Sequence, residues 1–239
     1  FLQRAYDNII HDVAIAQLPV ILCIDRAGIV GNDGATHHGL FDLAYLRPIP
    51  HLAICAPRTA SDLKAMMRLA PTLGSPVAIR YPRGRSMEDE GVKMKDERPI
   101  CIGKGVCLRE GKDMAVLSIG AIGNAVAEAI DLVDERAKNQ GPRLIAHYDM
   151  RWLKPIDEEL LREVGERYKT IVTVEDGVID GGLGSAVLEW MADHGFTPRV
   201  IRLGVRDRFV EHGSTQELYH LLKLDKEGIC ESLLQVPVK

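Results

Sequence analysis

Apolar residues recur at three- and four-residue steps through residues 2–14, which predicts an amphipathic helix. A nearly continuous apolar run over 18–25 follows, of the kind that predicts a fully buried strand of a parallel sheet. After a polar stretch, the pattern predicts a helix over 41–46, a strand over 51–57, a helix over 58–70 and a strand over 76–82. Strands that alternate with helices indicate a parallel α/β sheet.

Residues 85–99 are charged and lack periodicity, so they are the best candidate for a linker. Beyond them the alternation restarts, with strands predicted over 114–120, 143–150, 170–176 and 199–205, helices over 125–137 and 157–168, a further helix after the glycines of 181–184, and two helices near the end. We therefore predict an α/β fold of two three-layer units with mostly parallel sheets.

The predicted domain boundaries follow from this break. The first unit covers residues 1–85 and is incomplete at its N-terminus, residues 86–110 form the charged linker and an entry strand, and residues 111–239 form the second unit. Phe1 is not an initiator methionine, and helical periodicity begins at once. We therefore expect the chain to be part of a longer protein.

Composition and charge narrow the class of protein. The 239 residues are 46% hydrophobic and 27% charged, as in a globular protein that buries a real core. A net charge of −4 with both signs interspersed gives no general attraction to nucleic acid or to an acidic membrane, and no apolar run is long enough to span a bilayer. Five scattered cysteines without a CxxC pair indicate neither a zinc site nor a disulfide framework. Cys23 and Cys55 lie inside apolar runs, so we expect them to be buried, reduced thiols, which fits a reducing cytoplasm.

The candidate chemistry lies in the stretch from Arg26 to Gly39, directly after the first predicted strand. Ligands of open parallel sheets bind outside the carboxyl ends of the strands. The stretch combines an arginine with four glycines, which let the backbone approach a ligand, and with Asp33, His37 and His38. A histidine near an aspartate can move protons near neutral pH. The density of such residues favours a functional site over an incidental surface loop.

Arg80 and Arg83, at the end of the strand predicted over 76–82, are expected to add arginines to the same rim. Guanidinium groups make bidentate hydrogen bonds to phosphate or carboxylate, so Arg26 and Arg83 could converge on one phosphate. It is equally consistent with the sequence that Arg83 only pairs with the acidic linker. The glycines of 181–184 could cradle an anion at a helix N-terminus, but a tight strand-to-helix turn explains them as well. Ser214 and Glu217 form a predicted helix capping box.

The segments FLQRAYD, DRAG with the following DGATHHG, FDLAYLRPIP, RYPRG, KPID and GGLGS occur in this order along nearly the whole chain. In this series the chain resembles the 1-deoxy-D-xylulose-5-phosphate synthase family of the transketolase superfamily. FLQRAYD and DRAG with its histidine loop are specific to that family, whereas KPID and GGLGS are shared more widely. The resemblance implies a transketolase-like pyrimidine-binding domain followed by a transketolase C-terminal domain.

The resemblance also implies roles for single residues. Phe1 corresponds to the aromatic residue that stacks on the pyrimidine ring of thiamine diphosphate, and Arg4 to an arginine that contacts the donor acid. Arg26 and Arg83 correspond to the pair that grips the phosphate of the acceptor. Asp33 and His37 correspond to polar residues beside the reacting carbons. His38 stands where family members often carry Gln or Asn, and we assign the function to His37.

The implied reaction joins pyruvate, with loss of carbon dioxide, to D-glyceraldehyde 3-phosphate, and yields 1-deoxy-D-xylulose 5-phosphate, the first step of the non-mevalonate isoprenoid pathway. The family is a transferase that uses thiamine diphosphate and Mg²⁺ and forms homodimers. It acts in the bacterial cytoplasm or in a plastid-type stroma. Its activating glutamate and its GDG-type magnesium and diphosphate motif have no counterpart in this sequence, so we expect the chain alone to be inactive and to bind no metal itself. The alternatives are a transketolase, a 2-oxoacid dehydrogenase beta subunit, or a non-catalytic dimerisation module.

Overall fold

The computed structural model describes residues 2–84, 99–137, 141 and 143–237. The first part of the chain is helical from Leu2 to Ala14, where a 3₁₀ turn, a single α-turn and a π-helix follow one another. The elements after it are β1 (Ile21–Ile24), α2 (Asp42–Leu46), β2 (Ala53–Cys55), α3 (Ala60–Leu69), the 3₁₀ turn η3 (Ala70–Leu73) and β3 (Val77–Arg80). The helix–strand alternation predicted for this region is therefore present. Most of the predicted linker lies outside the described residues.

The second part contains the predicted strands and helices and one strand that the sequence pattern did not predict. Its elements are β4 (Val106–Arg109), β5 (Met114–Ser118), α4 (Ile122–Ala137), β6 (Ile145–Asp149), β7 (Trp152–Lys154), α5 (Glu158–Arg167), β8 (Thr170–Val178), α6 (Leu183–Asp193), β9 (Arg199–Val205), α7 (Thr215–Leu221) and α8 (Lys226–Leu234). The unpredicted strand is β7.

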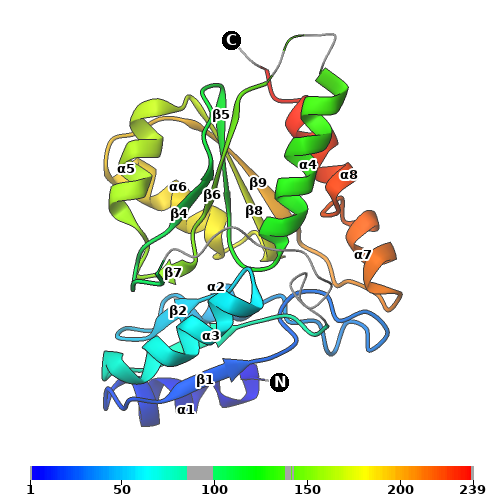
Figure 1. Ribbon diagram of the computed structural model, residues 1–239. Helices are drawn as coiled ribbons and strands as arrows, with labels where there is room; N and C mark the ends of the chain where they lie inside the picture. Colours follow the sequence, from blue (N-terminus) through cyan, green and yellow to red (C-terminus); the bar gives the residue numbers. More distant parts are fainter. Residues whose placement is uncertain (1, 85–98, 138–140, 142, 238–239) are drawn as a thin grey trace.

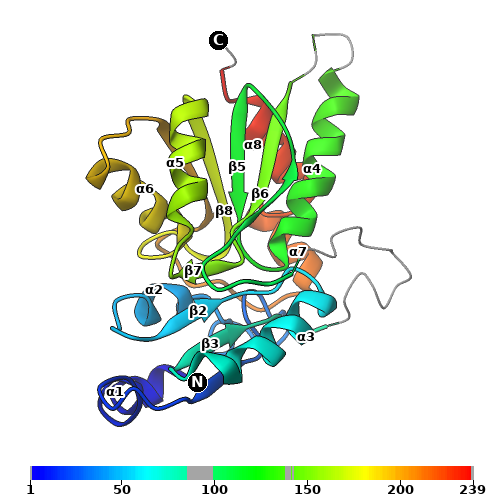
Figure 2. The ribbon, with the colours of Figure 1, turned by 60° about the vertical axis from the view of Figure 1, so that its left-hand side comes forward.

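The described strands form two mostly parallel sheets, which confirms the predicted α/β class. In the first sheet the order is β1-β3-β2-β7, and only β7 runs antiparallel to its neighbour. In the second sheet the order is β4-β6-β5-β8-β9, and only β4 runs antiparallel. Helices α5 and α6 cover one face of the second sheet, while α4 and α8 cover the other (Figures 1 and 2). The predicted domain boundaries stay a prediction, and β7 brings a strand from the second half into the first sheet.

The expectation of a fully buried strand over 18–25 was wrong, as was that of a buried thiol at Cys23. Of the β1 residues, Ile21, Leu22 and Ile24 are half-buried, whereas Cys23 is exposed. The reason is that β1 lies at the edge of the described sheet, with β3 on one side only. Central β3, in contrast, is buried throughout, and Cys55 in its neighbour β2 is buried as well.

Capping side chains define where the helices begin. The Thr59 hydroxyl accepts a hydrogen bond from the backbone N–H of Asp62, and the backbone N–H of Thr59 donates to the Asp62 carboxylate in return. Ser214 and Glu217 form the capping box that the sequence predicted. Asp225 accepts a hydrogen bond from the backbone N–H of Gly228 and caps α8. No helix among the described residues is long and apolar enough to cross a membrane.

The apolar core is continuous between the two sheets. One cluster contains Ile9 and Leu46 from the first part of the chain together with Leu117, Tyr148 and Leu183 from the second. A separate cluster packs α3 against the first sheet, and another packs α4 and α8 against the second. Because the first cluster includes residues of both sheets, burial of apolar surface holds them together.

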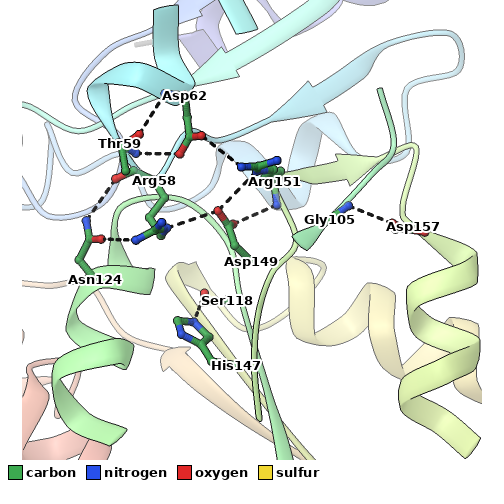
Figure 3. Close-up of polar contacts among 10 residues, drawn as sticks. All are labelled: Arg58, Thr59, Asp62, Gly105, Ser118, Asn124, His147, Asp149, Arg151 and Asp157. Carbon is green, nitrogen blue, oxygen red and sulfur yellow. Dashed lines mark hydrogen bonds and ion pairs between the residues drawn. The ribbon is translucent and has the colours of Figure 1, made fainter. Parts of the chain in front are cut away.

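A second set of contacts between the sheets is polar and buried (Figure 3). Arg58 lies 3.6 Å from the carboxylate of Asp149, and Arg151 lies 3.5 Å from Asp62. Below them, the Ser118 hydroxyl contacts His147 Nε2 at 2.8 Å. Burial, and then the charge of Arg58, lowers the pKa of His147 to about 3, so this imidazole is neutral and structural.

Arg80 is a buried charge whose guanidinium nitrogens all have partners in the protein. Its side chain is 2% exposed and donates to Asp42 at 2.7 Å, to Asp176 at 2.6 Å and to the carbonyl of Gly39 at 3.1 Å. The two carboxylates hold the pKa of Arg80 above its ordinary value despite the opposing effect of burial. The prediction that Arg80 lies on a ligand-binding rim was therefore wrong, because its three acceptors come from the protein.

The carboxyl group of Glu175, a residue of β8, lies at the N-terminus of α6. Its two carboxylate oxygens accept the backbone N–H groups of Leu183 at 2.8 Å and Gly184 at 2.9 Å. A β-carbon at Gly182 would lie 1.9 Å from Glu175 Oε2, so glycine leaves room for the carboxylate. The group that accepts these two N–H donors is thus a carboxyl group of the chain itself, which favours the tight-turn interpretation of 181–184.

We predict that Asp176→Ala destabilises the fold by roughly 3–5 kcal/mol, because it removes one partner of the buried Arg80 cation. Glu189→Ala is the matched control, since it breaks the bidentate pair with Arg47 at a half-exposed site and should cost no more than about 1 kcal/mol. Urea denaturation of both variants provides the measurement. Equal losses of stability would contradict the importance given to Arg80.

A second prediction concerns pH. Burial raises the pKa of Glu175 to about 7, although the hydrogen bonds from Gly184 and Leu183 oppose the shift. The folded state then holds the proton more tightly than the unfolded state, so this contribution to stability is complete below pH 4.5 and is lost as the pH rises to about 7. The advantage of wild type over Glu175→Gln should fall by on the order of 3 kcal/mol across that window in urea titrations.

Glu189 provides the control of opposite sign. The hydrogen bond from Arg47 lowers its pKa, so its contribution is present above the unfolded pKa and is lost as the pH falls. A wild-type advantage over Glu175→Gln that is constant or grows with pH would show that Glu175 is ionised in the fold.

Candidate functional site

The stretch from Arg26 to Gly39, which we call the glycine loop, is closed by backbone hydrogen bonds at its base. Gly28 and Gly39 exchange both of their N–H and C=O groups at 2.8 Å. A β-carbon at Gly39 would lie 2.3 Å from the carbonyl oxygen of Arg26, so this close approach requires glycine. The loop is therefore a built structure that follows β1, not an open connection.

The first sheet holds the base of the glycine loop in place. The N–H of Ala27 donates to the carbonyl of Tyr81 at 3.0 Å, directly after β3. Arg80, at the end of β3, donates to the carbonyl of Gly39 from the other side. The loop therefore lies at the carboxyl ends of β1 and β3, which is the edge where the sequence predicted a ligand site.

A pocket of about 520 Å³ adjoins β1 and the base of the glycine loop. Its polar lining includes Arg26, His37 and His38, so the structure brings both histidines and one of the predicted arginines to one pocket. The side chain of Arg26 donates to the neighbouring carboxylate of Asp25. The rest of the lining is mainly apolar and comes from the first helical turns, β1 and α2, with Leu2, Ala5, Ile21, Leu22, Ile24, Leu40, Phe41 and Tyr45.

Asp33 and Arg83 lie 3.5 Å apart as an ion pair, with both side chains substantially exposed. Arg83 lines a different pocket, of about 480 Å³, between the glycine loop, α4 and α7. The described structure therefore pairs Arg83 with Asp33 and places Arg26 and His37 at one pocket. The convergence of Arg26 and Arg83 on one anion stays a prediction.

The two adjacent histidines differ in their surroundings. His37 is half-buried, lines the pocket and contacts the hydroxyl of Thr36 through Nδ1 at 2.9 Å. His38 is 8% exposed and accepts a hydrogen bond from the N–H of Val30 at 3.1 Å. Its Nε2 lies 3.0 Å from the carbonyl of Glu211. Because Nδ1 is an acceptor, Nε2 carries the proton and donates to that carbonyl. The assignment of function to His37 over His38 stays a prediction.

The N-terminal residues adjoin the same pocket. Arg4 is exposed in the first turn, and its neighbours Gln3 and Ala5 line the pocket. Phe1 lies outside the described residues. The described residues contain no group of three or more His, Cys, Asp or Glu side chains placed to hold a metal ion.

Sequence reasoning missed Tyr45 as a lining residue. It lines this pocket and a neighbouring one of about 610 Å³ beside Phe209. Burial, and then the charge of Asp42, raises the pKa of Tyr45, so its hydroxyl stays protonated. The sequence predicted only a helix over 41–46, and no local signal separates a core tyrosine from one at a pocket wall.

Comparison with known proteins places this architecture in a family. The family model for the transketolase pyrimidine-binding domain matches residues 1–87, and the model for the transketolase C-terminal domain matches residues 103–229. The 1-deoxy-D-xylulose-5-phosphate synthase of Bacteroides thetaiotaomicron is 55% identical over 98% of this chain, and that of Caldanaerobacter subterraneus is 44% identical over 98%. The chain spans 36% of the length of each of these two relatives.

Solved structures agree with this result. A protein described as a split-gene transketolase, in an inactive beta4 tetramer, superposes with a TM-score of 0.80 at 28% identity, over 97% of this chain and 71% of that one. A transketolase from Pichia stipitis, at 19% identity and a TM-score of 0.67, covers 93% of this chain and 30% of its own length and shows the fold alone. This chain therefore belongs to the transketolase family, with sequence similarity to 1-deoxy-D-xylulose-5-phosphate synthases along nearly its whole length.

Proposed function

We propose that this chain is part of a 1-deoxy-D-xylulose-5-phosphate synthase, which condenses pyruvate and D-glyceraldehyde 3-phosphate with loss of carbon dioxide. The observation that carries the proposal is the glycine loop, whose Arg26 and His37 line one pocket at the carboxyl end of β1. The same chain is 55% identical to a bacterial synthase over 98% of its residues. Because it spans 36% of that relative, the activity is proposed for the whole protein.

The residues present fit part of thiamine diphosphate. The pocket beside β1 is lined mainly by apolar side chains, with Leu2, Ile24 and Tyr45 among them, and such walls suit a flat heteroaromatic ring. Phe1, which precedes Leu2 in the sequence, is the proposed stacking partner. Bound there, the cofactor would supply the carbanion chemistry that decarboxylation of a 2-oxo acid requires. Ligands for Mg²⁺ and the diphosphate are proposed to come from elsewhere in the whole protein.

The polar residues of the site have separate proposed tasks. His37 borders the pocket and would hold or move a proton near the reacting carbons, with Asp33 as the second polar group of the loop. Arg4 would contact the carboxylate of the donor. Arg26 and Arg83 would bind the acceptor phosphate, and for Arg83 the phosphate would replace the exposed pairing with Asp33.

Other members of the family are the alternative. A transketolase or a 2-oxoacid dehydrogenase beta subunit would use the same cofactor with a different donor or acceptor, and a non-catalytic dimerisation module would use none. The histidine-containing glycine loop favours the synthase. The name of the split-gene transketolase supports assembly of such chains, and we propose a homodimer for the whole enzyme. The two synthases compared above are bacterial, which favours the bacterial cytoplasm as the location of the whole enzyme.

We predict that the chain by itself forms no 1-deoxy-D-xylulose 5-phosphate when mixed with thiamine diphosphate, Mg²⁺, pyruvate and D-glyceraldehyde 3-phosphate. The reason is that its sequence contains no counterpart of the family's activating glutamate or GDG-type motif. Chromatography with mass detection of the product provides the measurement, with a complete bacterial synthase as the positive control. Product formed by the chain alone would show that it holds every essential group.

We predict that Ala at Arg26 or Arg83 in the full-length enzyme lowers kcat/KM for D-glyceraldehyde 3-phosphate by about ten- to a hundredfold. Each change removes a charge-assisted contact worth roughly 1.5–3 kcal/mol. Lys should restore part of the loss, because an ammonium group cannot reproduce the bidentate fork. Steady-state kinetics with D-glyceraldehyde 3-phosphate and with an unphosphorylated aldehyde provide the measurement.

Arg68→Ala is the matched control, because Arg68 is an exposed arginine of α3 that lines neither pocket. Pyruvate decarboxylation and the unphosphorylated aldehyde should respond little to any of these changes. If the Arg26 and Arg83 variants lose both aldehydes equally, the two arginines do not recognise the phosphate.

A further inference from the structure

The outer part of the glycine loop lies on a segment of the C-terminal half, residues 211–215, which we call the loop seat. A β-carbon at Gly31 would lie 2.9 Å from the hydroxyl of Thr215, and one at Gly34 would lie 3.2 Å from the β-carbon of His212. Both glycines have positive φ angles, of 83° and 70°. The absence of side chains at these two positions therefore lets the loop backbone rest directly on the loop seat.

His38 makes the hydrogen-bonded connection between the two segments. Its buried imidazole accepts the N–H of Val30, on the same loop, and donates to the backbone carbonyl of Glu211, at the start of the loop seat. One imidazole ring thus connects two backbone segments that are far apart in the sequence, since Glu211 follows His38 by 173 residues. Both His38 and its neighbour His37 line the pocket beside β1.

The loop seat is itself held firmly. Val210, directly before it, is 1% exposed and belongs to the core of the second sheet, as does Leu218 in α7. The capping box of Ser214 and Glu217 fixes the start of α7. Since the seat is anchored to a packed core, a loop bound to it takes its position from the C-terminal half.

We propose that His38 is a positioning residue, through which the C-terminal half sets the geometry of the glycine loop and therefore of His37 and Arg26. The C-terminal half then contributes to the site and does more than provide a surface for assembly. The part of this inference that concerns catalysis rests on the proposed synthase function, whereas the structural connection does not.

A glutamine at position 38 can replace the imidazole, because its amide oxygen can accept the Val30 N–H and its amide nitrogen can donate to the Glu211 carbonyl. A leucine of similar bulk fills the space but leaves both backbone groups without a partner. His38→Leu and His38→Gln are therefore a matched pair that separates hydrogen bonding from packing. His11→Leu, at an exposed histidine of the N-terminal helix, controls for loss of a histidine.

The test uses amide hydrogen exchange of the 239-residue chain, followed by mass spectrometry of peptides from the glycine loop. We expect His38→Leu to speed exchange in residues 28–38 by about tenfold or more, as loss of a buried hydrogen bond predicts, while α3 and β5 exchange as in wild type. His38→Gln and His11→Leu should stay close to wild type. Gly31→Ala, whose β-carbon would meet Thr215, should reproduce the leucine effect by a separate route.

The kinetic part uses the same two changes at position 38 in the full-length enzyme. The leucine variant should raise KM for the aldehyde acceptor by about tenfold with a smaller change in KM for pyruvate, and glutamine should rescue it. Unchanged loop exchange in both His38→Leu and Gly31→Ala would overturn the connection. Altered exchange in an enzyme that makes no 1-deoxy-D-xylulose 5-phosphate would leave the connection standing and refute the synthase function. Altered exchange with unchanged kinetics of an active synthase would refute the positioning role.

Discussion

The buried cation of Arg80 is the interaction on which the arrangement of this protein depends. It lies at the end of β3, yet its acceptors come from α2, from the glycine loop and from β8 of the second sheet. A guanidinium with 2% exposure needs such a complete set of partners, because burial of an unpaired charge is very costly. The side chain of Arg80 therefore links the positions of the glycine loop, of α2 and of the second sheet.

The two sheets are consequently packed against each other and do not form separate modules. Apolar residues of both form a common core cluster, and β7 extends the first sheet from the second half of the chain. The buried pairs Arg58–Asp149 and Arg151–Asp62 add polar contacts between them (Figure 3). With the loop seat beneath the glycine loop, the C-terminal half supplies part of the wall against which the candidate site is built.

The candidate site itself combines an apolar pocket with exposed charge. Arg26 and His37 line the pocket beside β1, whereas the ion pair of Asp33 and Arg83 lies at the outer side of the loop. Such a division suits a ligand with an apolar ring at one end and a phosphate-bearing substrate at the other. The exposed ion pair is weakly held, so a phosphate can take Asp33's place beside Arg83 at small cost.

The sequence by itself determined the α/β class, the approximate position of the long helices and central strands, the helix caps and the family, because these follow from local periodicity and short motifs. It also located the glycine loop, since a dense polar stretch after an apolar strand is a local signal.

The sequence could not reveal β7, whose three residues are too few to show a periodic pattern. It could not separate Arg80 from Arg83 or His37 from His38 in environment, because the deciding partners lie far away in sequence, Asp176 at 96 residues from Arg80 and Glu211 at 173 from His38. Only the tertiary structure brings those groups together, and burial then decides which of two like side chains is part of the framework and which stays more exposed.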